Sequence, residues 1–135
     1  LSQEDAVTAY GKKLGLAFQI TDDTLDYAAD QKQLGKVLGK DLEEGKVTLP
    51  LIYLIRRADP GEQDHIRNIL QADSVSEADL AYTLGLMTRH GAVDEALRVA
   101  QSLSDEAKAS LSVFPDSLPR QALAALADYV VQREM

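Results

Sequence analysis

The segment GKKLGLAFQITDDTLDYAAD, residues 11–30, predicts both a helix and a candidate functional site. On a helical wheel at about 100° per residue, its polar acids and one amide fall within a narrow stripe. The stripe contains Gln19, Asp22, Asp23, Asp26 and Asp30. Leucine, alanine, isoleucine and tyrosine side chains occupy most of the remaining circumference. A helix that is apolar over so much of its surface is normally buried, so we expect the acids to face a cleft and not open solvent.

Crowding carboxylates on one helix face costs free energy. Two carboxylates about 6 Å apart repel by roughly 2–3 kcal/mol at an effective dielectric of 20, and like charges four positions apart destabilise a helix. A partly buried acid cluster therefore raises its pKa values or binds cations. Oxygen ligands without His or Cys suit Mg²⁺, which takes one or two carboxylates and completes its shell with water and phosphate. The sequence predicts Mg²⁺ at Asp22, Asp23 and Asp26, and the alternative is a solvated acidic face.

A lysine-rich segment with glycines follows the acidic helix, from about residue 31 to residue 46. Its lysines are Lys32, Lys36, Lys40 and Lys46. Glycines allow tight backbone turns, and ammonium groups bind phosphate oxygens. Acids and lysines together therefore predict a diphosphate site. The alternative is a solvated loop whose lysines balance Asp41, Glu43 and Glu44, and for Lys40 both interpretations stay open.

The rest of the chain predicts an all-α helical bundle, because short connections join one helical pattern to the next. The expected helices span about residues 3–30, 49–57, 61–72, 77–90, 92–113 and 118–132. Capping residues are expected at Ser2, Thr48, Ser76 and Ser117, with Gly91 as a helix stop. The helices after residue 60 carry ordinary apolar stripes, which indicate core packing.

The composition narrows the class of protein. The 135 residues include no cysteine, which excludes disulfides and thiolate metal sites. The net charge of −8 argues against nucleic acid as a partner. The longest apolar run, residues 49–55, is too short for a transmembrane segment, and no signal peptide is visible, so we expect a cytoplasmic protein. The chain begins with Leu1 in an apparent helix start, which indicates a fragment or excised domain.

Two blocks of sequence resemble the trans-isoprenyl (polyprenyl) diphosphate synthase family. Residues 18–27, FQITDDTLDY, resemble the family's second aspartate-rich motif. The pair GK at residues 35–36 and GKDLEEGKVTLPL at residues 39–51 resemble the loop that follows it. Gly91-Ala92-Val93 and the ending LADYVVQR, residues 126–133, are similar to longer-chain bacterial members such as octaprenyl diphosphate synthases. The resemblance implies the C-terminal half of an all-α bundle around a deep apolar cavity.

The resemblance also implies a Mg²⁺-dependent prenyltransferase. Members of the family join an allylic diphosphate to isopentenyl diphosphate, giving a longer trans product, and the long products serve as quinone side chains. The implied catalytic residues are Asp22, Asp23 and Lys36, and the implied substrate-binding residues are Phe18, Gln19, Lys36 and Lys46. Asp22 would be the principal Mg²⁺ ligand. A homodimer is expected for the full-length protein.

One departure from the family is the absence of its first aspartate-rich motif and of the arginine pair that follows it. Arg56-Arg57 is a doublet, but it follows no aspartate cluster. We therefore expect the chain alone to be inactive, and condensation of the two diphosphates by the isolated chain would contradict this. Two alternatives stay open: a non-catalytic helical subunit of a heteromeric prenyl synthase, and a generic α-helical interaction domain with a fortuitous acid stripe.

A few single residues also need interpretation. Gly11 and Gly15 lie on the acidic side of the first helix, where each costs about 1 kcal/mol relative to alanine. Close helix packing and clearance for a ligand both explain them. His65 and His90 are expected on surface-like helices without a ligand role. Tyr10, Tyr27 and Tyr129 are expected to be packing or interface residues and not catalysts.

Overall fold

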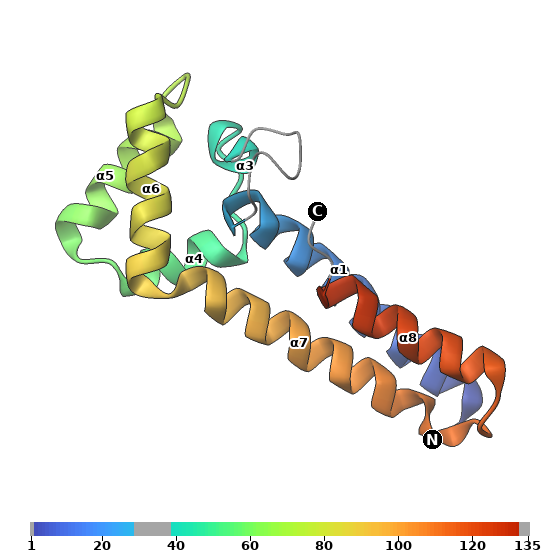
Figure 1. The fold of residues 1–135 in the computed structure, drawn as a ribbon. Coiled ribbons are helices and arrows are strands. Elements are labelled where there is room, and N and C mark those ends of the chain that lie inside the picture. The colour runs from blue at the N-terminus through green and yellow to red at the C-terminus, as the bar shows by residue number, and fades with distance from the viewer. Residues whose placement is uncertain (1, 29–38, 133–135) are drawn as a thin grey trace. The chain divides into compact units, whose positions relative to one another are not determined.

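The computed structural model describes residues 2–28 and 39–132, and every regular element in these ranges is a helix. The elements are α1 (Gln3–Ala28), α3 (Lys40–Glu43), α4 (Leu49–Arg57), α5 (Pro60–Gln71), α6 (Glu77–His90), α7 (Ala92–Ser110), the 3₁₀ turn η1 (Leu111–Val113) and α8 (Leu118–Gln132), as Figure 1 shows. The predicted all-α class is confirmed. Within the described residues, no helix combines the length and apolarity needed to cross a membrane.

Three of the four predicted capping residues, Ser2, Ser76 and Ser117, accept the expected N–H group, whereas Thr48 makes no side-chain capping hydrogen bond at the start of α4. Ser2 Oγ accepts the N–H of Asp5 at 3.1 Å at the start of α1, and Ser76 Oγ accepts the N–H of Asp79 at 3.0 Å at the start of α6. Gly91 ends α6 with a φ of 66°, the left-handed conformation that favours glycine. Because these interactions are local in sequence, the boundaries were predictable without tertiary structure.

Two local features differ from the prediction. Asp59, which lies between the expected helices 49–57 and 61–72, is the N-cap of α5: its Oδ1 accepts the N–H of Glu62 at 2.8 Å, and Glu62 Oε1 accepts the N–H of Asp59 at 3.0 Å. The D-x-x-E spacing of Asp59 and Glu62 is that of a reciprocal capping box, but the neighbouring Pro60 and Gly61 are also typical of a turn. In addition, residues 40–43 form the short helix α3 within the expected loop.

The chain divides into two compact units, and α1 and α7 contribute to both. The terminal unit comprises described residues 2–21 and 97–132. Its core contains Tyr10, Ala107, Leu111 and Ala127. Tyr10 Oη donates to the carbonyl oxygen of Leu123 at 2.7 Å, and Ser104 Oγ donates to that of Ala127 at 2.7 Å. These two hydrogen bonds connect α1 and α7 to α8.

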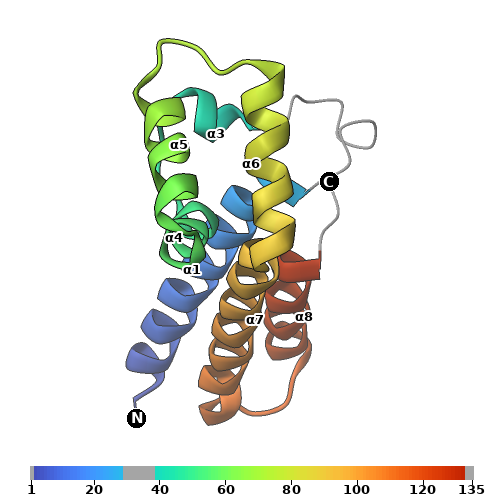
Figure 2. The same cartoon turned by 90° about the vertical axis from the view of Figure 1, so that its left-hand side faces the viewer.

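The central unit comprises described residues 22–28 and 39–96. Its core contains Tyr27, Leu42, Leu51, Leu54, Ile66, Ile69, Leu86, Met87 and Ala92. Helices α4, α5 and α6 can be followed in Figure 2, and α4 packs against α6. Stacked rings of His65 and Tyr82, with centroids 4.0 Å apart, join α5 to α6. Since Tyr27 and Leu42 belong to the same core, the end of α1 and the helix α3 are held together.

His90 has a structural role that its sequence context did not indicate. Its side chain is only 20% exposed, and its Nε2 lies 3.0 Å from Glu62 Oε1. Arg57 Nη1 donates to the His90 carbonyl oxygen at 2.8 Å and pairs through its other nitrogen with Glu95. The expectation of a surface position is wrong for this histidine, because the turn between α6 and α7 brings it against α5.

The expectation that the first helix is largely buried is also wrong for the structure described here. Ala17 is fully buried, but Leu16 and Phe18 are 53% and 45% exposed. Around Gly11 and Gly15, no described atom lies within 4 Å of the position that a Cβ would occupy. The described residues therefore cover only part of the apolar circumference, and they provide no close helix packing at either glycine.

Candidate functional site

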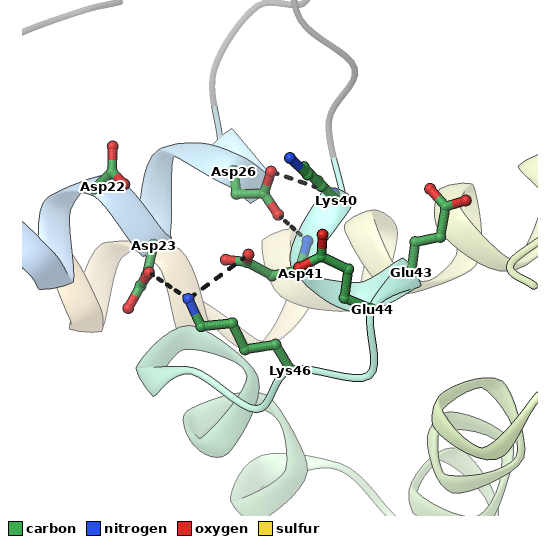
Figure 3. A pocket seen from close by; sticks show the side chains of 8 residues that line it. All are labelled: Asp22, Asp23, Asp26, Lys40, Asp41, Glu43, Glu44 and Lys46. Carbon is green, nitrogen blue, oxygen red and sulfur yellow. Dashed lines mark hydrogen bonds and ion pairs between the residues drawn. The ribbon is translucent and has the colours of Figure 1, made fainter.

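An open cavity of about 630 Å³ lies between the end of α1 and residues 40–46 (Figure 3). Its lining is strongly polar: Asp22, Asp23, Asp26, Lys40, Asp41, Glu43, Glu44 and Lys46. Six of these eight side chains are acidic and two are basic. The acid stripe and the lysine-bearing segment therefore meet in one cavity, as the sequence predicted.

Asp26 organises the side of this cavity formed by α3. The residue is only 5% exposed. Its Oδ1 accepts the N–H of Lys40 at 3.3 Å, and its Oδ2 accepts the N–H of Asp41 at 3.0 Å. Its carbonyl oxygen also accepts the N–H of Gly39 at 2.9 Å. One residue of α1 thus binds three consecutive backbone N–H groups where α3 begins.

The turn that brings the chain into α3 requires glycine. Gly39 has a φ of 79°, in the left-handed region, and a Cβ added there would collide with the side chain of Leu80. Gly45, which follows α3, has a φ of 71°. The predicted use of glycine for tight turns is confirmed at these two positions.

Lys46 lies between two carboxylates of the cavity lining, one on α1 and one on α3. Its Nζ is 3.8 Å from Asp23 Oδ1 and 4.0 Å from Asp41 Oδ1. The two carboxylate side chains are 14% and 16% exposed, whereas the lysine side chain is 52% exposed. The ammonium therefore partly neutralises two shielded acids and still reaches solvent.

The electrostatics of Asp41 show that this neutralisation is incomplete. Burial raises the pKa of the Asp41 carboxyl above its ordinary value, and the neighbouring charge of Asp26 raises it further. Lys46 opposes this shift in the pKa without cancelling it, while Asp23 adds to it. A carboxylate in such a position favours an additional cation nearby.

Tyr27 lies beside the acids and belongs to the core of the central unit. Burial raises the pKa of its phenol, and the charges of Asp26, Asp41 and Asp23 raise it further. A phenol with a raised pKa stays neutral at physiological pH, so Tyr27 is unsuited to proton transfer. The prediction that this tyrosine packs is confirmed.

The structure gathers part of the predicted set of site residues. Asp22, Asp23, Asp26 and Lys46 line the cavity. Phe18 and Gln19 are exposed on α1 and do not belong to its lining. Asp30, Lys32 and Lys36 lie outside the described residues.

Asp41 lines the cavity, whereas its sequence context predicts only a charge that balances nearby lysines. Its position inside the GKDLEEGK block, between two glycine turns, was the available signal. Its closeness to Asp26 and Lys46 emerges only from the fold.

The donor set fits Mg²⁺, although it does not form a closed metal cage. In residues 2–28 and 39–132, no three His, Cys, Asp or Glu side chains are grouped closely enough to hold a metal ion alone. Figure 3 shows Asp23 directed towards Lys46 and Asp22 directed away from it. Mg²⁺ commonly binds one or two carboxylates and takes its other ligands from water and substrate phosphate. The carboxylate oxygens present are thus suited to a metal that a phosphate ligand shares.

The net charge of the lining residues limits which ligands the cavity can bind. Because acids outnumber lysines, a diphosphate entering alone would meet a net negative surface. Each divalent cation bound at the acids would offset two of these negative charges and present a positive centre to the diphosphate. The arrangement can therefore hold a diphosphate together with divalent metal.

Known proteins are similar to the chain in both sequence and fold. Residues 1–87 match the family model of polyprenyl synthetases. The chain is 39% identical to octaprenyl diphosphate synthase of Haemophilus influenzae over 132 residues, which cover 98% of the chain and 40% of that protein. It is 40% identical over 129 residues to a short chain isoprenyl diphosphate synthase of Methanothermobacter thermautotrophicus, covering 96% and 39% of the respective chains.

A solved structure gives the same result for the fold. The polyprenyl synthase of Caulobacter crescentus, crystallised with calcium and isoprenyl diphosphate, superposes with a TM-score of 0.89 and 41% identity. The alignment covers 97% of this chain and 40% of that one, so the chain spans about two fifths of the length of its relatives. With a family model that covers more than half of its residues, the chain belongs to the polyprenyl synthetase family.

Proposed function

We propose that the cavity binds the diphosphate of an allylic substrate through Mg²⁺ in a trans-polyprenyl diphosphate synthase. The whole protein would condense this substrate with isopentenyl diphosphate to give a longer trans-polyprenyl diphosphate. The observation that carries the proposal is the meeting of Asp22, Asp23 and Lys46 in one acid-rich cavity. The names of the relatives support the reaction class, and the calcium and isoprenyl diphosphate of the Caulobacter crescentus structure support a divalent metal with a diphosphate.

Asp22 and Asp23 would hold the metal, because both line the cavity and are only partly covered. Asp26, the predicted third ligand, already accepts one N–H group at each oxygen, so direct binding to the metal would compete with these hydrogen bonds. When bound, Mg²⁺ neutralises negative charge on the departing diphosphate. The carboxylates themselves bind and orient, and none of them needs to transfer a proton.

Lys46 would supply the positive charge on the opposite side of the diphosphate. An ammonium on a flexible stem has three donors and can turn from carboxylate to phosphate oxygen. Its half-exposed position between Asp23 and Asp41 supports this role. Lys36, Phe18 and Gln19 complete the proposed substrate contacts, as the family resemblance implies.

The assembly and setting of the full-length protein extend the proposal. We infer a cytoplasmic homodimer whose product supplies a quinone side chain. The exposed apolar side chains of Val7, Leu16 and Phe18 on α1 support a further protein surface that covers this helix.

Thermal unfolding with inorganic pyrophosphate and Mg²⁺ tests the proposal on the chain itself. A ligand present at 100 times its Kd stabilises the folded state by about 2.7 kcal/mol, which gives a readily measured rise in Tm. We expect this rise only when both Mg²⁺ and pyrophosphate are present. Asp22→Ala and Lys46→Met should each reduce it strongly.

The matched control is Asp73→Ala, which removes an exposed carboxylate outside the cavity. This variant should keep the full response to Mg²⁺ and pyrophosphate. A wild-type chain whose Tm does not respond would contradict the proposal and favour a helical interaction domain. An equal loss of response in the control would show that bulk charge, and not the cavity, produces the effect.

A further inference from the structure

The hydrogen bonds of Asp26 connect α1 to the proposed phosphate-binding lysine by a continuous path. Asp26 Oδ2 accepts the N–H of Asp41 at 3.0 Å. The carbonyl oxygen of Asp41 then accepts the N–H of Lys46 at 2.8 Å. The Nζ of Lys46 in turn lies 3.8 Å from Asp23, which precedes Asp26 by about one helical turn on α1. The path therefore starts and ends on the same helix.

We propose that Asp26 is a positioning residue, which holds α3 and the following turn so that Lys46 faces Asp23. This inference rests on the proposed function, because it assigns to Asp26 the placing of the lysine that binds diphosphate. Asp26 acts through the backbone of residues 39–41, whereas Asp22 and Asp23 act on the ligand.

The backbone N–H groups at the start of α3 explain why a carboxylate is needed at this point. The first N–H groups of a helix have no partner inside the helix. Gly39, which occupies the N-cap position of α3, has no side chain that could accept them. The Asp26 carboxylate accepts the N–H groups of Lys40 and Asp41 from outside the helix. It thus replaces the local cap that the glycine turn excludes.

Burial distinguishes Asp26 from the other acids of its motif. It is 5% exposed, while Asp22 and Asp23 are both partly exposed. A buried carboxylate requires hydrogen-bond donors that compensate for its lost hydration, and charge-assisted hydrogen bonds from N–H groups are stronger than neutral ones. The donors that bind the Asp26 carboxylate are the first N–H groups of α3. The same hydrogen bonds therefore stabilise the buried carboxylate and hold the start of α3.

Amide hydrogen exchange tests the inference on the wild-type chain without any ligand. The N–H groups of Lys40 and Asp41 have no other partner in α3, so their protection depends on Asp26. We expect both amides to be protected in the wild type. In Asp26→Asn at least one of the two should exchange about tenfold faster or more, because the side-chain amide keeps only one acceptor oxygen. Unprotected amides in the wild type would overturn the inference even if the variant failed to fold.

Pyrophosphate binding with Mg²⁺ then separates positioning from metal ligation. Asp26→Asn and Lys46→Met should each reduce the rise in Tm. If Asp26 acts by placing Lys46, adding Asp26→Asn to Lys46→Met should reduce the response no further. Independent, additive losses would instead show that Asp26 binds the metal directly and would refute positioning through the lysine.

Asp73→Asn serves as the control, since it makes the same chemical change on an exposed residue outside the cavity. It should alter neither the exchange of the two amides nor the response to pyrophosphate. A wild-type chain that ignores pyrophosphate but shows protected amides would contradict the proposed function alone. Unprotected amides in a chain that responds to pyrophosphate would contradict the positioning role alone.

Discussion

Replacing Gly39 by alanine perturbs the turn that leads into the cavity in two ways. The φ of 79° is unfavourable for an L-residue, which costs about 1–2 kcal/mol. The new Cβ would also collide with Cδ1 at the end of the Leu80 side chain, which is only partly buried and can turn away, so this overpacking costs up to about 3 kcal/mol. We therefore expect Gly39→Ala to lower the free energy of unfolding by about 1–5 kcal/mol.

Gly91→Ala provides a matched comparison for this substitution. Gly91 has a similar φ of 66°, but the atom nearest to its added Cβ is Arg57 Nη1 at 3.6 Å, an ordinary contact. Its replacement should cost only the backbone contribution of about 1–2 kcal/mol. The excess for Gly39→Ala measures the collision with Leu80.

Urea denaturation followed by far-UV circular dichroism gives the free energies of unfolding. The double variant Gly39→Ala with Leu80→Ala should be less destabilised than the sum of its two single variants, because the shorter side chain relieves the collision. Equal costs for Gly39→Ala and Gly91→Ala, together with additivity in the double variant, would show that Leu80 does not obstruct the new Cβ.

Three further predictions concern a helix, a hydrogen bond and a titration. Gly15→Ala should raise the free energy of unfolding by about 1 kcal/mol in thermal unfolding, since alanine favours the helix and no described atom obstructs its Cβ; a loss of stability would contradict this. Ser104→Ala should cost about 0.5–1.5 kcal/mol in urea denaturation, because it removes a buried hydrogen bond between α7 and α8, whereas Ser110→Ala, which removes an exposed bond within α7, should cost less. The raised pKa of Asp41 means that its carboxyl binds a proton more tightly in the folded state than in the unfolded state. Ionised Asp41 therefore lowers the free energy of unfolding at pH values above the raised pKa. This penalty disappears as the pH falls towards the ordinary pKa of 3.8. Asp41→Asn should therefore stabilise the chain at neutral pH and lose this advantage in acid, and a difference that does not change with pH in urea denaturation would refute the assignment.

Features that depend on neighbours along the chain were predictable from the sequence. Ser2 and Ser76 cap their helices as expected, and Gly91 ends α6. The acid stripe on α1 was also predictable, because the helical repeat determines the angle of every side chain about one axis. The same reasoning failed for the burial of Leu16 and Phe18, since periodicity shows which surface needs cover and not which segment supplies it.

Interactions between neighbours along the chain are enough to predict the all-α class, the grouping of Asp22, Asp23 and Asp26 on one helix, and the lysine-bearing segment after them. The fold is needed to place the Asp26 carboxylate against N–H groups 14 and 15 positions later, and Lys46 between Asp23 and Asp41. A helix constrains residues a few positions apart, whereas the path of the intervening chain selects the partners of distant ones. Packing of Tyr27 and Leu42 into one core makes that selection here.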